Sequence, residues 1–320
     1  MKILNLLSIC LCFLATPLLA EAEPEAEQCR DLNIGVVDWT DLHVVNGVAK
    51  ALLEELGYKV SLQMEPATPQ VFEKLASRRI DVFMGYWTPA MSPIAEPYFS
   101  SGAVETISSN LNEARWTLAV PDYVYEQGLR NFADISRFSE KLQGRIYGLE
   151  KGSSGNAAIL DMIDSDAFGL KDFKLIETTE RIMMAQVKGK VRRGQWIVFM
   201  GWQPHPMNIN YSIRYLGGGD DYFGPDYGAA IVNTTVRSGL TEQCPNLRRF
   251  FTNLTFKASI EEEMMDQVGK FVPVDRAVRH WMYQNPGQVK EWLQGVTYFN
   301  GAAVNPSAMA SGMELTMSGQ

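Results

Sequence analysis

Residues 81–89 read DVFMGYWTP, and residues 197–206 read IVFMGWQPHP. Each stretch begins with an apolar run typical of a buried strand and continues into a glycine, a tryptophan and a proline. In open α/β sheets, ligands bind beyond the carboxyl ends of the strands. The stretches therefore predict two strands that direct Trp87 and Trp202 toward ligand-binding edges. Chance similarity of two buried strands explains the shared letters VFMG equally well.

Similar apolar runs recur along the chain and alternate with amphipathic segments. We expect helices at 42–57, where Gly57 provides a C-cap, and at 157–169. Strand–helix alternation at this spacing is typical of α/β proteins with parallel strands. The expected strands lie at 33–38, 59–64, 80–85, 116–120, 145–150, 173–178, 196–201 and 229–234.

The number of expected strands favours two lobes over one. It is too large for one compact sheet of ordinary size, and one strand–helix set is complete by about residue 110 before another begins. Residues 244–295 are expected to form three helices rich in Leu, Phe, Met and Trp, and the last residues are expected to form a mobile tail.

The composition excludes one class of partner. The chain has 320 residues, 46% of them hydrophobic, which is enough for one large core or two modest cores. Its formal net charge is −8 and its pI is near 5.1. Because nucleic-acid binding needs a basic face, we expect no nucleic-acid partner.

The sequence lacks the patterns of metal centres and of common hydrolase or nucleotide sites. It contains three histidines, which lie far apart: His43, His205 and His280. None has cysteine or carboxylate neighbours at zinc-site spacing, and GxSxG, HExxH and Walker A motifs are absent. KGSSGN (151–156) opens a helix after a strand, but a serine N-cap explains it better than a phosphate loop. No metal and no cofactor are predicted.

Residues 1–22 have the features of a secretory signal. An apolar run follows a basic residue, and Ala20-Glu21-Ala22 provides a small-x-small cleavage pattern. A membrane anchor is the alternative, but the run is short, contains Pro17 and lacks a flanking basic stop. A lipid anchor at Cys10 would require a small residue where Ile9 stands. We expect an unanchored, exported protein.

The cysteines fit an exported protein. Cys10 and Cys12 are removed with the signal, which leaves Cys29 and Cys244. In an oxidising compartment this pair is expected to form one disulfide. The bridge would hold the N-terminus against the C-terminal part of the fold.

Tryptophans provide the strongest functional signal. Trp196, Trp281 and Trp292 are expected in the core, whereas four others lie beside the ends of expected strands: Trp39, Trp87, Trp116 and Trp202. Such a cluster can stack on sugars or bind a quaternary ammonium group through cation–π contacts. Asp41 could complement the cation or accept a hydrogen bond from a ligand hydroxyl, although an N-cap role is equally open.

Taken together, several motifs resemble the periplasmic choline-binding proteins of bacterial ABC importers, within the wider glycine-betaine-binding group. The resemblance extends from Cys29 to about Val296 and rests on these stretches: VVDWTDLH, DVFMGYWTP, WTLAVPDY, GRIYGLEKGSSGN, FMGWQPHPMN and GGDDYFGPDYGAA. It implies an α/β clamshell of the periplasmic-binding-protein type, with a mixed sheet flanked by helices in each lobe. The implied segments are lobe 1 at 29–114 and 212–300, lobe 2 at 115–211 and a tail at 301–320.

The resemblance also implies the site. By motif, the aromatic box that binds the quaternary ammonium group would consist of Trp39, Trp87, Trp116 and Trp202. The residues that bind the ligand hydroxyl would be Asp41 and Asn156, and the cysteine pair of the family matches Cys29 and Cys244. Trp116 departs from the choline-specific pattern, in which this position is a tyrosine, so another trimethylammonium compound is an open alternative.

We therefore expect a monomeric, non-catalytic periplasmic receptor that delivers choline to a membrane permease. An ionised Asp41 disfavours the carboxylate of glycine betaine, which supports choline. The alternatives are another methylated amine, such as glycine betaine, carnitine or trimethylamine N-oxide, or a sensing role. An enzyme would need a catalytic partner for Asp41, and a sugar receptor would need more amides and carboxylates beside the tryptophans.

Overall fold

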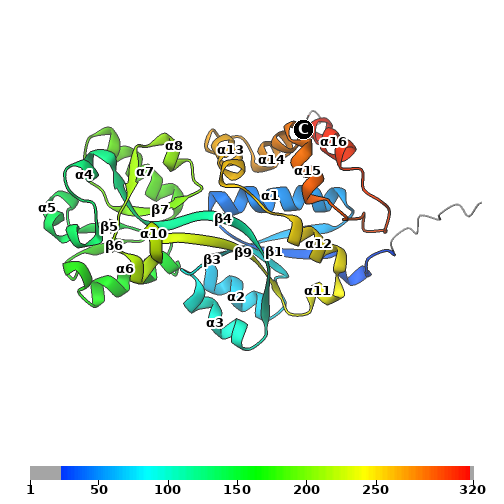
Figure 1. Cartoon of the computed structure of the whole chain (residues 1–320), viewed down its shortest axis with the longest axis horizontal. Helices are drawn as coiled ribbons and strands as arrows, with labels where there is room; N and C mark the ends of the chain where they lie inside the picture. The colour runs from blue at the N-terminus through cyan, green and yellow to red at the C-terminus, as the bar shows by residue number, and fades with distance from the viewer. Residues whose placement is uncertain (1–22, 318–320) are drawn as a thin grey trace, which may run out of the picture.

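A computed structural model describes residues 23–317. The expected signal peptide, with Cys10 and Cys12, lies outside the described residues. Figure 1 shows two masses of helices and strands, joined mainly by two long strands, β4 and β9. The mixed α/β class and the two-lobed architecture predicted from the sequence are confirmed.

The strands form one curled sheet in the order β2-β1-β3-β9-β4-β7-β5-β6, with β8 paired to β4. Pairs within the two outer parts are parallel, whereas β9, β4 and their neighbours pair antiparallel. The sheet is therefore mixed, as predicted, but it is one sheet that runs through both lobes, whereas the number of expected strands favoured more than one sheet. The strands are β1 (Asp31–Val37), β2 (Lys59–Glu65), β3 (Val82–Thr88), β4 (Val104–Pro121), β5 (Arg145–Tyr147), β6 (Lys174–Ile176), β7 (Phe199–Gln203), β8 (Ile213–Tyr215) and β9 (Ala229–Arg237).

Strand β4 is far longer than the expected strand at 116–120, because it extends back to Val104. Its register against β9 shifts three times, and the bulges obscure the period-two pattern that marks a strand in the sequence. The two lobes therefore share a continuous sheet. The predicted boundary at 114/115 falls inside β4, and β8 pairs with the end of β4 beyond that boundary. We propose that β9 returns the chain to the first lobe.

Helices cover the faces of the sheet in both lobes. Figure 1 shows α1 above β1 and β3, with α2 and α3 below them, while α4 to α8 surround the short strands of the other lobe. The helices before the C-terminal part are α1 (Thr40–Glu55), α2 (Thr68–Ala76), α3 (Ser92–Ser100), α4 (Asp122–Glu126), α5 (Ser139–Leu142), α6 (Ser154–Asp164), α7 (Glu180–Arg192), α8 (Met207–Asn210), α9 (Asp220–Phe223), α10 (Pro225–Gly228) and α11 (Leu240–Gln243).

The C-terminal part differs from the prediction in two respects. Residues 244–295 contain four helices rather than three, namely α12 (Pro245–Asn253), α13 (Ala258–Gly269), α14 (Val274–Gln284) and α15 (Pro286–Trp292). The expected tail contains α16 (Pro306–Met317), which packs on α14 and α15. Met309, Ala310 and Met313 are buried there. These three apolar side chains lie on one side of the helix, at positions i, i+1 and i+4, so the segment packs on the fold and does not form the mobile tail expected from the sequence.

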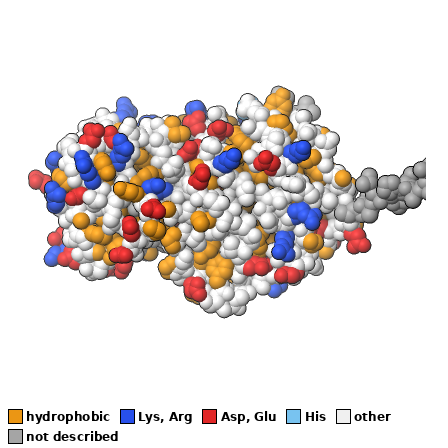
Figure 2. All heavy atoms as spheres, viewed as in Figure 1, with side chains coloured by type: hydrophobic (Ala, Val, Ile, Leu, Met, Phe, Trp, Pro, Cys, Tyr) orange, Lys and Arg blue, Asp and Glu red, His pale blue; other side chains and the backbone are white. Residues whose placement is uncertain are grey.

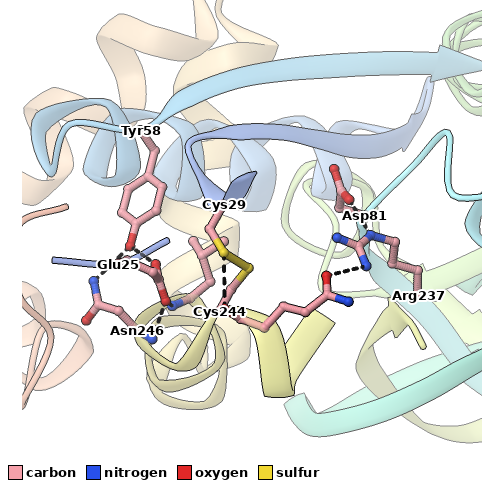
Figure 3. The surroundings of a disulfide bond; sticks show 9 residues. Glu25, Cys29, Tyr58, Asp81, Arg237, Cys244 and Asn246 are labelled. Carbon is pink, nitrogen blue, oxygen red and sulfur yellow. Dashed lines mark hydrogen bonds and ion pairs between the residues drawn. A yellow bond between two sulfur atoms is a disulfide. The ribbon is translucent and has the colours of Figure 1, made fainter. Parts of the chain in front are cut away.

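The predicted disulfide is confirmed and ties the N-terminus to α12 (Figure 3). Cys29 and Cys244 are bonded with their Cα atoms 5.8 Å apart, across a sequence separation of 215. Nearby, the Glu25 carboxylate accepts hydrogen bonds from the Tyr58 hydroxyl and, at 2.6 Å, from the backbone N–H of Asn246 at the start of α12. A carboxylate at a helix N-terminus satisfies donors that the helix itself leaves free. The disulfide and Glu25 therefore hold the same two segments together.

The described surface has mixed charge. On the face shown in Figure 2, Lys and Arg side chains are interspersed with Asp and Glu side chains and do not gather into a basic patch. Among the described residues, no helix combines the length and apolar character needed to cross a membrane.

Candidate ligand-binding site

The four tryptophans singled out in the sequence lie together where the two lobes meet. Trp116 is the central ring, with its centroid 6.1 Å from that of Trp39, 5.8 Å from that of Trp87 and 5.7 Å from that of Trp202. The interplanar angles are 44–48°, so the rings are tilted rather than stacked. We call Trp39, Trp87, Trp116 and Trp202 the tryptophan cluster. Each of them is at most 3% exposed.

Strand geometry explains how residues far apart in sequence meet. Trp116 of β4 and Trp202 of β7 face each other directly in an antiparallel pair, which brings their side chains close on one face of the sheet. Trp87 lies within β3, and Trp39 precedes the first turn of α1. Gly155 gives the Trp116 ring room, because a Cβ there would lie 2.9 Å from the ring. The cluster thus depends on the register of the sheet and on one glycine.

Asp41 lies in the first turn of α1 and is 5% exposed. Its Oδ1 has no hydrogen-bond partner among the described residues. Burial, reinforced by the nearby Glu180 carboxylate, raises the pKa of Asp41 to about 7. Asp41 is therefore a buried acceptor that a cation or a hydroxyl group could satisfy.

Glu180 links the two lobes. It begins α7, and its carboxylate accepts hydrogen bonds from the backbone N–H of Thr40 at 2.9 Å and from the Thr40 hydroxyl. Trp39, the N-cap residue of α1, provides no side-chain cap, so Glu180 supplies the cap from the opposite lobe. Burial opposes ionisation of Glu180, but the hydrogen bond from His205 and the bonds from Thr40 outweigh it and lower the pKa of Glu180.

His205 connects Glu180 to the tryptophan cluster. Its ring lies 4.5 Å from that of Trp202. Its Nδ1 accepts the backbone N–H of Met207 at 3.0 Å, so the proton lies on Nε2, which donates to Glu180 at 3.1 Å. His205, for which no role was predicted, therefore orients a carboxylate that bridges the lobes.

Glu150 is a second bridge between the lobes. The indole Nε1 of Trp39 donates to its Oε2 at 3.1 Å, while its Oε1 is buried and has no partner among the described residues. Burial is the main cause that raises the pKa of Glu150, and the carboxylates of Glu180 and Asp38 add to it. Sequence reasoning missed Glu150 and Glu180. Glu150 did offer a signal, because it ends an expected strand, and Trp39, Trp87 and Trp202 lie just past the ends of theirs.

Asn156 is placed differently from the other predicted site residues. Its side-chain oxygen accepts the N–H of Leu149 at 2.9 Å, and its amide nitrogen donates to the carbonyls of Leu149 and Glu150 at 2.8 and 3.1 Å. The amide thus holds the loop that carries Glu150. Ser153 caps α6, as its side chain accepts the backbone N–H of Asn156, which confirms the N-capped helix start predicted for KGSSGN.

The electrostatic character of the site follows from these groups. The carboxylates of Glu180 and Glu150 add to the effect of burial in raising the pKa of Asp41, and that of Glu180 likewise adds to the raised pKa of Glu150. In the part of the chain that the structure describes, no Lys or Arg forms an ion pair with any of the three. The described residues also contain no group of three or more His, Cys, Asp or Glu side chains arranged to hold a metal ion.

These features define a two-lobed α/β protein in which a buried cluster of indole rings lies beside carboxyl groups that have no cationic partner among the described residues. Comparison with known proteins gives the family. Residues 30–284 match the substrate-binding domain of the ABC-type glycine betaine transport system. The chain belongs to this family, which serves solute transport and is not a family of enzymes.

Solved relatives support the assignment. An ABC-transporter choline-binding protein in complex with choline is 38% identical, with a TM-score of 0.86, over 90% of this chain and 99% of that chain. An ABC-transporter choline-binding protein in an unliganded, semi-closed conformation is 38% identical, with a TM-score of 0.81, over 89% of this chain and 99% of that chain. The glycine betaine/carnitine transport binding protein GbuC of Listeria monocytogenes is 24% identical over 55% of this chain and 58% of its own length.

Proposed function

We propose that this protein captures choline in the tryptophan cluster and delivers it to the permease of an ABC importer. The observation that carries the proposal is the arrangement of three indole rings around Trp116, with centroids within 6.1 Å, beside the unpartnered Oδ1 of Asp41. A cation over one indole face gains about 0.5–2 kcal/mol, so several faces supply the energy of a micromolar complex before ordering costs.

Asp41 favours choline over a zwitterion. The hydroxyl of choline can donate to Asp41, and its trimethylammonium group carries no compensating negative charge. Glycine betaine would instead bring a carboxylate toward three buried carboxyl groups, those of Asp41, Glu150 and Glu180, and like charges at this depth repel strongly. Other quaternary or methylated amines remain the alternative ligands, because Trp116 replaces the tyrosine of the choline-specific pattern.

The two-lobed fold suggests how capture proceeds. Trp39 and Asp41 belong to the lobe that contains α1, whereas Glu150, Glu180 and Trp202 come from the opposite lobe. A ligand that contacts both sides stabilises the closed arrangement relative to the open one. We propose that the protein works as a periplasmic monomer released from its signal peptide, and that a permease recognises the closed form. A sensing role is the second candidate function for the same ligand.

Ligand titration tests the proposal. We expect choline to change the tryptophan fluorescence of the purified protein saturably at micromolar concentration. Acetylcholine, carnitine, glycine betaine and trimethylamine N-oxide provide the comparison, and glucose provides a negative control. Absence of a response to every methylated amine would contradict the proposed function.

The buried carboxyl group of Asp41 predicts that binding depends on pH. Without ligand the pKa of Asp41 is about 7, and a bound cation favours the ionised form, so binding releases a proton below that pH. The affinity for choline should be highest above pH 7 and fall by about tenfold between pH 8 and pH 6.

Calorimetric titration across this pH range checks the sign and the size of the effect. Asp41→Asn should bind choline more weakly at pH 8 and should flatten the profile, leaving only the dependence due to Glu150 and Glu180. A wild-type profile that Asp41→Asn leaves unchanged would remove Asp41 from the proposed site.

A further inference from the structure

We propose that Glu150 is a further ligand-recognition residue, which makes the site select a net positive charge by placing a carboxylate at the edge of the Trp39 ring. The inference rests on the proposed function, because it concerns how the same site distinguishes its ligands.

The position of Glu150 is fixed by its own loop. Strand β5 ends at Tyr147, and the Asn156 side chain then holds the backbone of Leu149 and Glu150 through three hydrogen bonds of 2.8–3.1 Å. Gly148 is needed here, because a Cβ at this position would lie 2.2 Å from Oδ1 of Asn156. The loop therefore presents the Glu150 carboxyl group in one place.

From that place the carboxylate reaches across to the opposite lobe. Its Oε2 accepts the indole N–H of Trp39 at 3.1 Å. A hydrogen bond to an ionised acceptor is stronger than one between neutral groups, so Glu150 orients the ring. It also places negative charge at the edge of an indole whose face would bind the cation, and the two attractions add.

The other carboxylate oxygen of Glu150 indicates that no described side chain neutralises the charge of this group. Oε1 is buried without a partner among the described residues, and the charged groups that act on Glu150 are the carboxylates of Glu180 and Asp38. A buried carboxylate without a cationic partner is unfavourable, and a bound organic cation removes that cost. A neutral or zwitterionic ligand of the same shape would not.

Glu150→Gln separates charge from geometry, because the amide oxygen can still accept the Trp39 N–H. The affinity of each variant for choline is measured by calorimetric titration. Its affinity for 3,3-dimethyl-1-butanol, the uncharged carbon isostere of choline, is measured by displacement of bound choline. We expect Glu150→Gln to weaken choline binding by about tenfold while the Kd of the alcohol changes less than about twofold. Glu140→Gln makes the same charge change at an exposed site in the same lobe and should leave both constants unchanged.

Two results would overturn the inference. One is a Glu150→Gln variant that binds choline as tightly as wild type, and the other is an equal loss for choline and the alcohol, which indicates that Glu150 only positions Trp39. Wild-type protein that binds no quaternary amine would instead contradict the proposed function, so the two failures are distinguishable.

Discussion

Replacing Trp87 by alanine is expected to weaken choline binding by about a hundredfold or more. The substitution removes one cation–π contact and one apolar wall of the tryptophan cluster, which together correspond to about 3 kcal/mol. It also leaves a void beside Trp116, whose ring lies 5.8 Å away, so the remaining walls are less well held. Isothermal titration with choline measures the loss.

Two further variants make this result interpretable. Trp87→Phe keeps an aromatic face and should lose only about tenfold, while retaining more of the stability that the buried indole supplies. Trp196 lies outside the cluster, in the lobe opposite the one that contains Trp87, where its ring packs on that of Phe138. Trp196→Ala should therefore leave the Kd for choline unchanged. If Trp87→Ala folds, as judged by its thermal transition, and still binds choline like wild type, the cation does not lie in the cluster.

The second large effect is expected from removal of the disulfide, which should change the free energy of unfolding rather than the affinity for choline. Its separation of 215 residues restricts a long loop in the unfolded chain, so the double variant Cys29→Ser/Cys244→Ser should lose about 4–5 kcal/mol of the free energy of unfolding. The transition temperature should fall by about 10 °C. Thermal unfolding with circular dichroism detection measures the shift, and wild type under reducing conditions provides a matched comparison.

The same variant should bind choline normally below its transition. Cys29 and Cys244 lie in the core of the lobe that contains α1 and α12, separate from the core that contains the tryptophan cluster. A transition temperature unchanged from wild type would show that the contacts of Glu25 with Tyr58 and α12 suffice to hold the N-terminus.

The tryptophan cluster could be predicted because its members follow a local rule. Trp39, Trp87 and Trp202 each follow an apolar run, and the carboxyl ends of such strands gather at one edge of a sheet. The structure refines the rule, since Trp87 and Trp202 are the last residues but one of their strands rather than residues beyond them. The cluster therefore follows from strand patterns that a short window of sequence contains.

Glu150, Glu180 and the length of β4 could not be predicted in this way. The roles of both glutamates depend on Trp39 and Thr40, more than a hundred residues earlier, and exist only when the lobes are placed together. A helix cap supplied from another lobe has no signature in its own segment. Strand β4 was underestimated because its bulges interrupt the alternation of buried and exposed residues.

A crystal structure of the protein with choline tests the central claim most directly. We expect the quaternary nitrogen to lie within about 6 Å of the ring centroids of Trp39, Trp87, Trp116 and Trp202, with the hydroxyl donating to Asp41. Electron density for choline away from these rings would contradict the account. So would rings that pack against one another and leave no room for choline between them.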